Sequence, residues 1–83
     1  MSSAKEISPE NRAYYRELGL NIAFYRRRAG LTQEQLAEKL DISRSHLSAL
    51  EAPNIVRTCS LELLFDLARA LGTTPSKLLE FRD

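Results

Sequence analysis

The sequence has very little of several residue types on which site chemistry often depends. It contains one cysteine, Cys59, one histidine, His46, and no tryptophan. A single cysteine excludes an internal disulfide and a four-cysteine zinc site, and one histidine cannot complete a metal-ligand set with it. We therefore expect no metal and no cofactor. The scarcity of cysteine also favours a reducing compartment, and the cytoplasm is the expected location.

Long apolar stretches are also missing. The longest apolar run is Ile22–Tyr25, far short of the roughly 20 residues that a membrane-spanning helix needs. Residues 1–11 are polar and lack the apolar core of a secretory signal, so no contact with a membrane is expected. A chain of 83 residues forms one small domain and has little room for an enclosed catalytic cavity. We therefore expect neither an enzyme nor a small-molecule ligand.

The net charge of +1 conceals an uneven distribution. Residues 12–58 carry eight basic and five acidic side chains, whereas the segments 1–11 and 59–83 each carry one more acidic than basic residue. The middle of the chain is therefore mildly basic. This favours a polyanionic partner only weakly, because a pI above about 9 would be needed to indicate one by itself.

Apolar residues recur at intervals of three and four, and no stretch alternates with a period of two, which predicts an all-α fold of five helices. The first helix begins at Pro9 after the cap Ser8 and ends at Gly30. It either runs unbroken or breaks near Gly19, because glycine costs about 1 kcal/mol inside a helix. We assign residues 1–8 to a flexible tail and 9–83 to one domain. The expected inward face of this helix consists of Leu18, Ile22, Tyr25 and Ala29.

Capping signals predict where the other helices begin. Thr32 and Gln35 form a capping box, and Pro53 and Gly72 are typical of helix ends. The four later helices are expected to follow Thr32, Ser43, Ser60 and Thr74. The apolar residues expected on the last two helices are Leu61, Leu64, Leu67, Ala68, Leu71, Leu78, Leu79 and Phe81. The last three either cover the core or belong to an interface.

Only residues 41–43 separate the second and third helices, and this spacing predicts a helix-turn-helix over residues 32–51. Ala37 is small enough for two helices to cross closely, and Ile42 in the turn can fill the core. In this motif the outward face of the second helix, here residues 44–51, enters the major groove of DNA. Arginine can contact guanine there, serine can contact several base edges, and an alanine methyl can touch a thymine methyl. The expected base contacts are Arg44, Ser45, Ser48 and Ala49.

Phosphate contacts are expected at the two helix starts and in the loop after the third helix. Free amides and the helix dipole favour an anion at a helix N-terminus. His46, which has no companion ligand, fits a backbone-phosphate contact or a partly buried structural position. The expected phosphate contacts are Thr32, Gln33, Ser43, His46, Asn54 and Arg57.

The run GLTQEQLAEKLDISRSHLSALE, residues 30–51, resembles the lambda-repressor-like (Cro/Xre-type) helix-turn-helix family, and the similarity extends from Ile22 to Leu79. The resemblance implies that Gln33 anchors to phosphate and that Arg44 and its neighbours face bases. It also implies a structural ion pair between Arg26 and Glu51. Ala52–Pro53 replaces the glycine that is usual in the family, and the following loop is longer than usual. In both features the sequence resembles the controller proteins of restriction–modification systems.

These observations favour a sequence-specific transcriptional regulator that binds double-stranded DNA as a homodimer, paired through its C-terminal helices on a pseudo-palindromic operator. The alternative is a protein-interaction adaptor, such as an antitoxin-like module. Its support is the near-neutral charge and a surplus of apolar residues in the first helix: Tyr14, Tyr15, Leu20 and Phe24.

Overall fold

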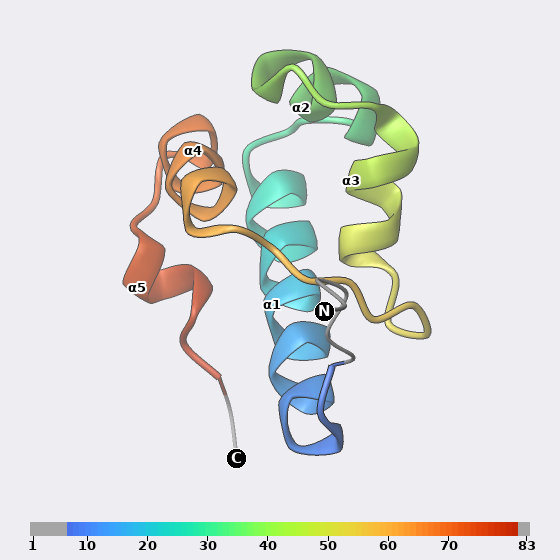
Figure 1. The fold of residues 1–83 in the computed structure, drawn as a ribbon. Coiled ribbons are helices and arrows are strands. Elements are labelled where there is room, and N and C mark those ends of the chain that lie inside the picture. Colours follow the sequence, from blue (N-terminus) through green and yellow to red (C-terminus); the bar gives the residue numbers. More distant parts are fainter. Residues whose placement is uncertain (1–6, 82–83) are drawn as a thin grey trace.

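The computed structural model describes residues 7–81, and within this range it contains five helices and no strand. The helices are α1 (Pro9–Arg28), α2 (Gln33–Leu40), α3 (Arg44–Glu51), α4 (Leu61–Leu71) and α5 (Pro75–Leu78). The long α1 runs through the centre, α2 lies across one of its ends, and α3 and the α4–α5 pair lie on opposite sides of it (Figure 1). The predicted all-α fold is confirmed. The predicted tail, residues 1–8, falls mostly outside the described residues.

Each helix begins at a polar cap, as the sequence predicts. The side chains of Ser8, Thr32, Ser43, Ser60 and Thr74 each accept a hydrogen bond from the backbone N–H three residues later. These bonds satisfy amides that have no partner inside the helix. Thr32 and Gln35 complete the reciprocal capping box.

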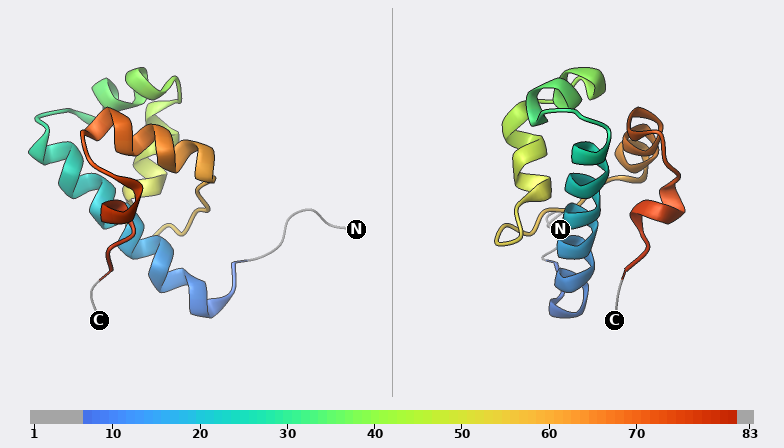
Figure 2. Two further views of the ribbon diagram at one scale, coloured as in Figure 1. Left: turned by 90° about the vertical axis from the view of Figure 1, so that its left-hand side faces the viewer. Right: turned by 180° about the vertical axis from the view of Figure 1, so that it is seen from behind.

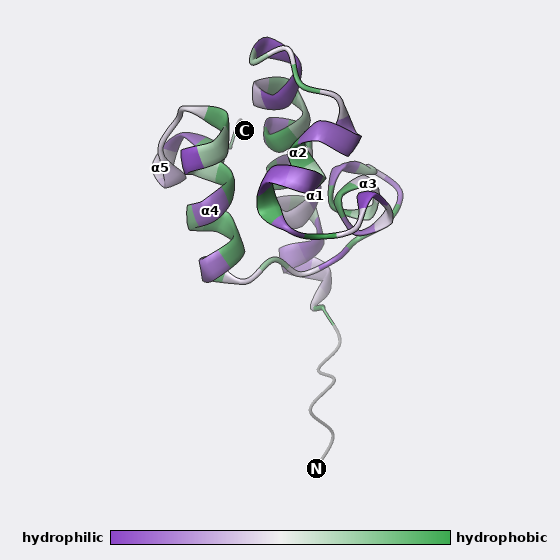
Figure 3. Ribbon diagram, turned by 90° about the horizontal axis from the view of Figure 1, so that it is seen from above, coloured by the Kyte–Doolittle hydropathy of each residue, from purple (hydrophilic) through white to green (hydrophobic). Residues whose placement is uncertain are grey.

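The five helices share a single core. Each helix contributes one fully buried large side chain, and these are Ile22, Leu36, Leu47, Leu67 and Leu78. Viewed from above, hydrophobic parts of α1 and α4 face each other across this core (Figure 3). Because every element depends on the same cluster, no part of the described fold has a core of its own.

α1 is one continuous helix, so the predicted alternative of a break near Gly19 is wrong. Gly19 is buried where α1 passes α3. A Cβ atom at this position would lie 2.2 Å from the carbonyl oxygen of Leu50, well inside van der Waals contact. The glycine therefore marks a close approach between two helices, which offsets its low helix propensity.

Four apolar residues of the expected helices lie outside the buried core. Ala29 is exposed because α1 ends one residue before it. Leu61 is 65% exposed because it is the first residue of α4 and lies at the rim of the core. The last helix ends at Leu78, so Leu79 and Phe81 lie beyond it and are exposed and half-buried respectively.

The segment after α5 is fixed to α1 by one side chain. The Nδ2 atom of Asn21 donates hydrogen bonds to the carbonyl oxygens of Leu78, at 2.9 Å, and Glu80, at 3.1 Å. This places Phe81 beside α1, where its ring stacks on Tyr14. Two further views show the last segment running beside the first half of α1 (Figure 2). Among residues 7–81, no helix is both long enough and apolar enough to cross a membrane.

The first prediction concerns Gly19. Gly19→Ala should destabilise the protein by about 1–3 kcal/mol, because the added methyl forces α1 and α3 apart. The free-energy cost of this separation should exceed the gain in helix propensity. Urea unfolding followed by circular dichroism measures the change. A midpoint equal to or above the wild-type value would show that the close contact with Leu50 has no energetic role.

Candidate nucleic-acid interface

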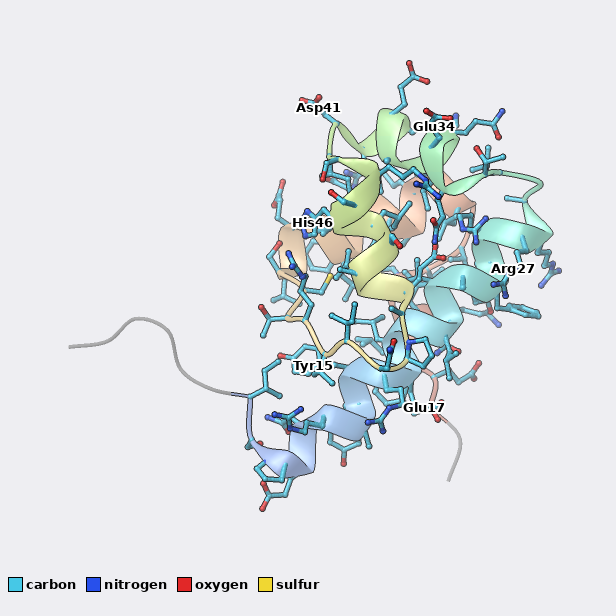
Figure 4. The ribbon with its side chains drawn as sticks, turned by 90° about the vertical axis from the view of Figure 1, so that its right-hand side faces the viewer. Tyr15, Glu17, Arg27, Glu34, Asp41 and His46 are labelled. Atoms are coloured by element: carbon cyan, nitrogen blue, oxygen red, sulfur yellow. The ribbon has the colours of Figure 1, made fainter. Side chains whose placement is uncertain are left out.

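The four predicted base-contacting residues lie on one side of α3. Arg44 and Ser45 in its first turn are exposed, and Ser48 and Ala49 are half-buried. The opposite side of the helix carries Leu47 and Leu50, which are buried in the core. α3 therefore presents a short polar face, which we call the outer face of α3, that begins at its N-terminal end (Figure 4).

A buried ion pair fixes the other end of α3. Arg26 on α1 donates from Nε to Oε2 of Glu51 at 2.8 Å and from Nη2 to Oε1 at 3.1 Å. Its Nη1 donates to the carbonyl oxygen of Leu31 at 2.8 Å. The two residues are 9% and 6% exposed, so this forked pair lies within the protein interior. It joins α1, the last turn of α3 and the loop that leads into α2.

Gln33 belongs to the same network. Its Nε2 atom donates to Oε1 of Glu51 at 2.9 Å. A carboxamide nitrogen carries two hydrogens, so one N–H is left for another acceptor. The buried carboxylate of Glu51 thus fixes the side chain of Gln33, the predicted phosphate anchor. Sequence reasoning missed this contact, because nothing local links residues 18 positions apart.

A surface cavity brings two predicted contact regions together. It lies between the starts of α2 and α3 and is lined by Arg26, Thr32, Gln33, Glu34 and Arg44. Arg44 and the first amides of α2 supply positive charge, and Glu34 is the only acidic side chain in the lining. Ser43 lies next to this region, where its Oγ accepts from the N–H of His46 at 3.0 Å. This arrangement suits an anionic group near the start of α3.

Two further predicted phosphate contacts lie at the other end of α3. Asn54 and Arg57 are exposed on the loop of residues 52–60 that leads to α4. One side chain fastens this loop to α1, since Nε of Arg16 donates to the carbonyl oxygen of Pro53 at 3.1 Å. No pattern in the sequence singles out Arg16 for this contact. His46 is half-buried, which is compatible with either role expected for it.

A second surface feature is apolar and lies away from the outer face of α3. This groove, which we call the apolar groove, runs between α1, the start of α4 and the segment after α5. Tyr14 stacks on Phe81 at its edge, with ring centroids 5.7 Å apart. Burial raises the pKa of the Cys59 thiol, which favours an apolar packing role over a reactive one. The lining residues are Asn11, Tyr14, Tyr15, Leu18, Cys59, Leu61, Leu64, Leu79 and Phe81.

A family profile described as helix-turn-helix matches residues 22–78, which include all of α2, α3, α4 and α5. The chain belongs to the Cro/Xre-type helix-turn-helix family of transcriptional regulators. The resemblance seen in the sequence is therefore confirmed. The family is a class of regulators and not of enzymes. Within residues 7–81, no group of three or more histidine, cysteine or acidic side chains is arranged to hold a metal ion.

Similar proteins support this assignment to the helix-turn-helix family. An uncharacterized HTH-type transcriptional regulator, y4dJ of Sinorhizobium fredii, is 37% identical over 62 residues, which are 75% of this chain and 78% of the relative. The crystal structure of the restriction–modification controller protein C.AhdI from Aeromonas hydrophila has a TM-score of 0.75 at 30% identity, covering 83% of this chain and 97% of that one. The biofilm regulator SinR, solved in complex with DNA, has a TM-score of 0.69 at 30% identity, covering 76% and 98%.

The second prediction concerns the buried pair of this helix-turn-helix domain. Glu51→Ala should lower the free energy of unfolding by about 3–5 kcal/mol, because it leaves the guanidinium of Arg26 buried without a countercharge. The double variant Arg26→Met/Glu51→Leu removes both charges and should be more stable than Glu51→Ala. Urea unfolding of both variants measures this order. A double variant less stable than Glu51→Ala would contradict the argument from the stranded charge.

Proposed function

We propose that this protein is a sequence-specific transcriptional regulator that binds double-stranded DNA as a homodimer on a pseudo-palindromic operator. The observation that carries the proposal is the outer face of α3. It exposes Arg44 and Ser45, and the one acidic residue of the helix, Glu51, is buried and paired with Arg26. A face of this kind, narrow, polar and free of exposed carboxylates, suits the major groove.

In this proposal the residues around the start and the end of α3 contact phosphates, and the outer face of α3 contacts bases. The predicted phosphate contacts lie before α3 (Thr32, Gln33), at its start (Ser43, His46) and after it (Asn54, Arg57), and such contacts set the register of the protein on the duplex. Arg44 forks onto a guanine edge, Ser45 and Ser48 bond to base edges, and Ala49 touches a thymine methyl. Gln33 holds its phosphate with the N–H that Glu51 leaves free.

The similar proteins support DNA as the partner. SinR was solved in complex with DNA, and C.AhdI is a controller protein of a restriction–modification system. Both share the fold over most of their length. Neither comparison supplies an operator sequence for this chain, because a few side chains and the shape of the DNA together determine it.

Two copies are part of the proposal because one domain of this size contacts few base pairs. Family members of this class bind half-sites about one helical turn, roughly 34 Å, apart. The apolar groove is the surface we assign to the pairing, since its rim residues Leu61 and Tyr14 are 65% and 56% exposed. Of the two C-terminal helices expected to form the pairing surface, α4 contributes Leu61 and Leu64 to the groove. The groove contains no residue of α3, so pairing leaves the outer face of α3 free.

One observation favours a second function, binding to another protein. Leu20 and Phe24 on α1 are 46% and 54% exposed and do not belong to the apolar groove. They lie with Glu17 and Lys77 around a separate cavity between α1 and α5. A stoichiometric protein partner captured by this surface, together with no DNA binding at low salt, would support the adaptor in place of the regulator.

The third prediction tests DNA binding. Wild-type protein should bind a fluorescein-labelled random-sequence duplex with micromolar affinity at low salt and lose affinity steeply as salt rises. Arg44→Ala should bind more weakly, because it removes a side chain from the centre of the interface. Arg28→Ala removes the same charge beside Gly72 and Lys77, away from α3, and is the matched control. Fluorescence anisotropy measures all three. Equal affinity of Arg44→Ala and Arg28→Ala would remove α3 from the interface.

The fourth prediction tests the pairing surface. Leu61→Glu should convert a dimer to a monomer, because a carboxylate would be buried without a partner in the apolar groove. Leu20→Glu introduces the same charge on the other side of α1 and should leave the dimer intact. Analytical ultracentrifugation gives the mass of each variant. Loss of the dimer in Leu20→Glu with none in Leu61→Glu would assign the interface to the Leu20–Phe24 surface.

A further inference from the structure

The loop after α3 is fastened to the first half of α1 by Arg16. Its Nε donates to the carbonyl oxygen of Pro53, two residues after the end of α3, and its side chain is exposed. A guanidinium has five N–H donors, and this bond uses one of them. Within residues 7–81, no carboxylate forms a salt bridge with Arg16. Most of its hydrogen-bonding capacity is therefore unused beside the end of the helix that we propose to enter the major groove.

The surroundings of Arg16 are basic. Arg12 is four residues earlier on the same helix, so the two side chains share a face of α1. The loop contributes Arg57 and Asn54 and contains no acidic residue between Ala52 and Cys59. Three exposed arginines therefore belong to the segments that meet at the C-terminal end of α3.

The opposite flank of α3, formed by α2 and the turn after it, is acidic. α2 and the turn after it expose three acidic side chains, Glu34, Glu38 and Asp41, against one basic side chain, Lys39. Figure 4 shows Glu34 and Asp41 beyond one end of α3, while the loop and the first half of α1 lie at the other. A strand of phosphates that continues past the helix-turn-helix would be repelled on the acidic side and attracted on the basic side.

We propose that Arg16 binds a backbone phosphate of the DNA flanking the half-site, with Arg12 and Arg57 contributing to the same positive surface. This inference rests on the proposed function and extends its interface from α2 and α3 to the first half of α1. The bond to Pro53 holds the guanidinium next to the loop, so little side-chain entropy is lost when a phosphate binds. The remaining N–H donors supply a charge-assisted, forked contact to the phosphate oxygens.

Because Arg16 also tethers the loop, its test must separate charge from tethering. Arg16→Ala removes both, whereas Arg16→Lys keeps the charge but cannot reproduce the Nε bond to Pro53. Arg28→Ala again serves as the control for loss of one positive charge at a distance. Each protein is titrated against a labelled random-sequence duplex of about 30 base pairs, long enough to extend past two half-sites. Anisotropy is recorded over a series of salt concentrations, and thermal unfolding shows that each variant is folded.

We expect Arg16→Ala to bind more weakly and to reduce the slope of log K against log salt by about 0.9, the value for one neutralised phosphate. A fourfold increase in salt should then reduce the ratio of the wild-type binding constant to that of Arg16→Ala about 3.5-fold. Arg16→Lys should retain most of the wild-type slope, and Arg28→Ala all of it.

Two results would overturn the inference alone. The first is a slope for Arg16→Ala equal to that of Arg28→Ala, in a protein that still binds DNA and is weakened by Arg44→Ala. The second is a slope for Arg16→Lys as low as that of Arg16→Ala, which would limit Arg16 to tethering the loop. Absence of binding by the wild-type protein, even at the lowest salt, would overturn the proposed function and this inference together.

Discussion

The bidentate contact between Arg26 and Glu51 is the interaction on which the position of the outer face of α3 depends. It is buried, and it joins the last turn of α3 to the last turn of α1. Through the carbonyl of Leu31, Arg26 also contacts the loop before α2. Glu51 also holds Gln33. One carboxylate therefore positions both α3 and Gln33, the side chain expected to contact phosphate. Removing the carboxylate of Glu51 would disturb the positions of α3 and Gln33, because the buried guanidinium of Arg26 would then lack a countercharge.

Close packing between α1 and α3 complements this ion pair. Gly19 lets the backbone of α1 approach Leu50, and the side chain of Arg16 reaches the loop that follows. α1 thus contacts α3 or its loop through Arg16, Gly19 and Arg26, which recur every three to seven residues along one side of the helix. These contacts lie within residues 16–26 of the 20-residue helix. Its opposite side carries Tyr14 and Asn21, which contact the segment after α5.

Sequence reasoning succeeded where the physics is local. Caps such as Ser43 and Thr32 act on amides three residues away, and Gly72 ends a helix through its own backbone geometry, so each helix start and the fold class could be predicted. It failed for contacts between distant segments. The approach of Gly19 to Leu50, the bond of Gln33 to Glu51 and the tether from Arg16 to Pro53 depend on packing that no local pattern encodes. The Arg26–Glu51 contact was the exception, and it came from the family resemblance alone.

A protein with a net charge of +1 cannot gain DNA affinity from its total charge, so the affinity must come from where its charges lie. Beyond the proposed contacts of Thr32 and Gln33, the exposed acidic residues of α2 would repel phosphates, whereas the arginines of the loop and α1 would attract them on the other flank of α3. This asymmetry favours one orientation on the duplex and weakens binding in all others. In the proposed homodimer, a second copy related by a two-fold axis would repeat the same preference on the other half-site. Low total charge would then limit non-specific binding, while the two domains together would keep the number of phosphate contacts that a specific site requires.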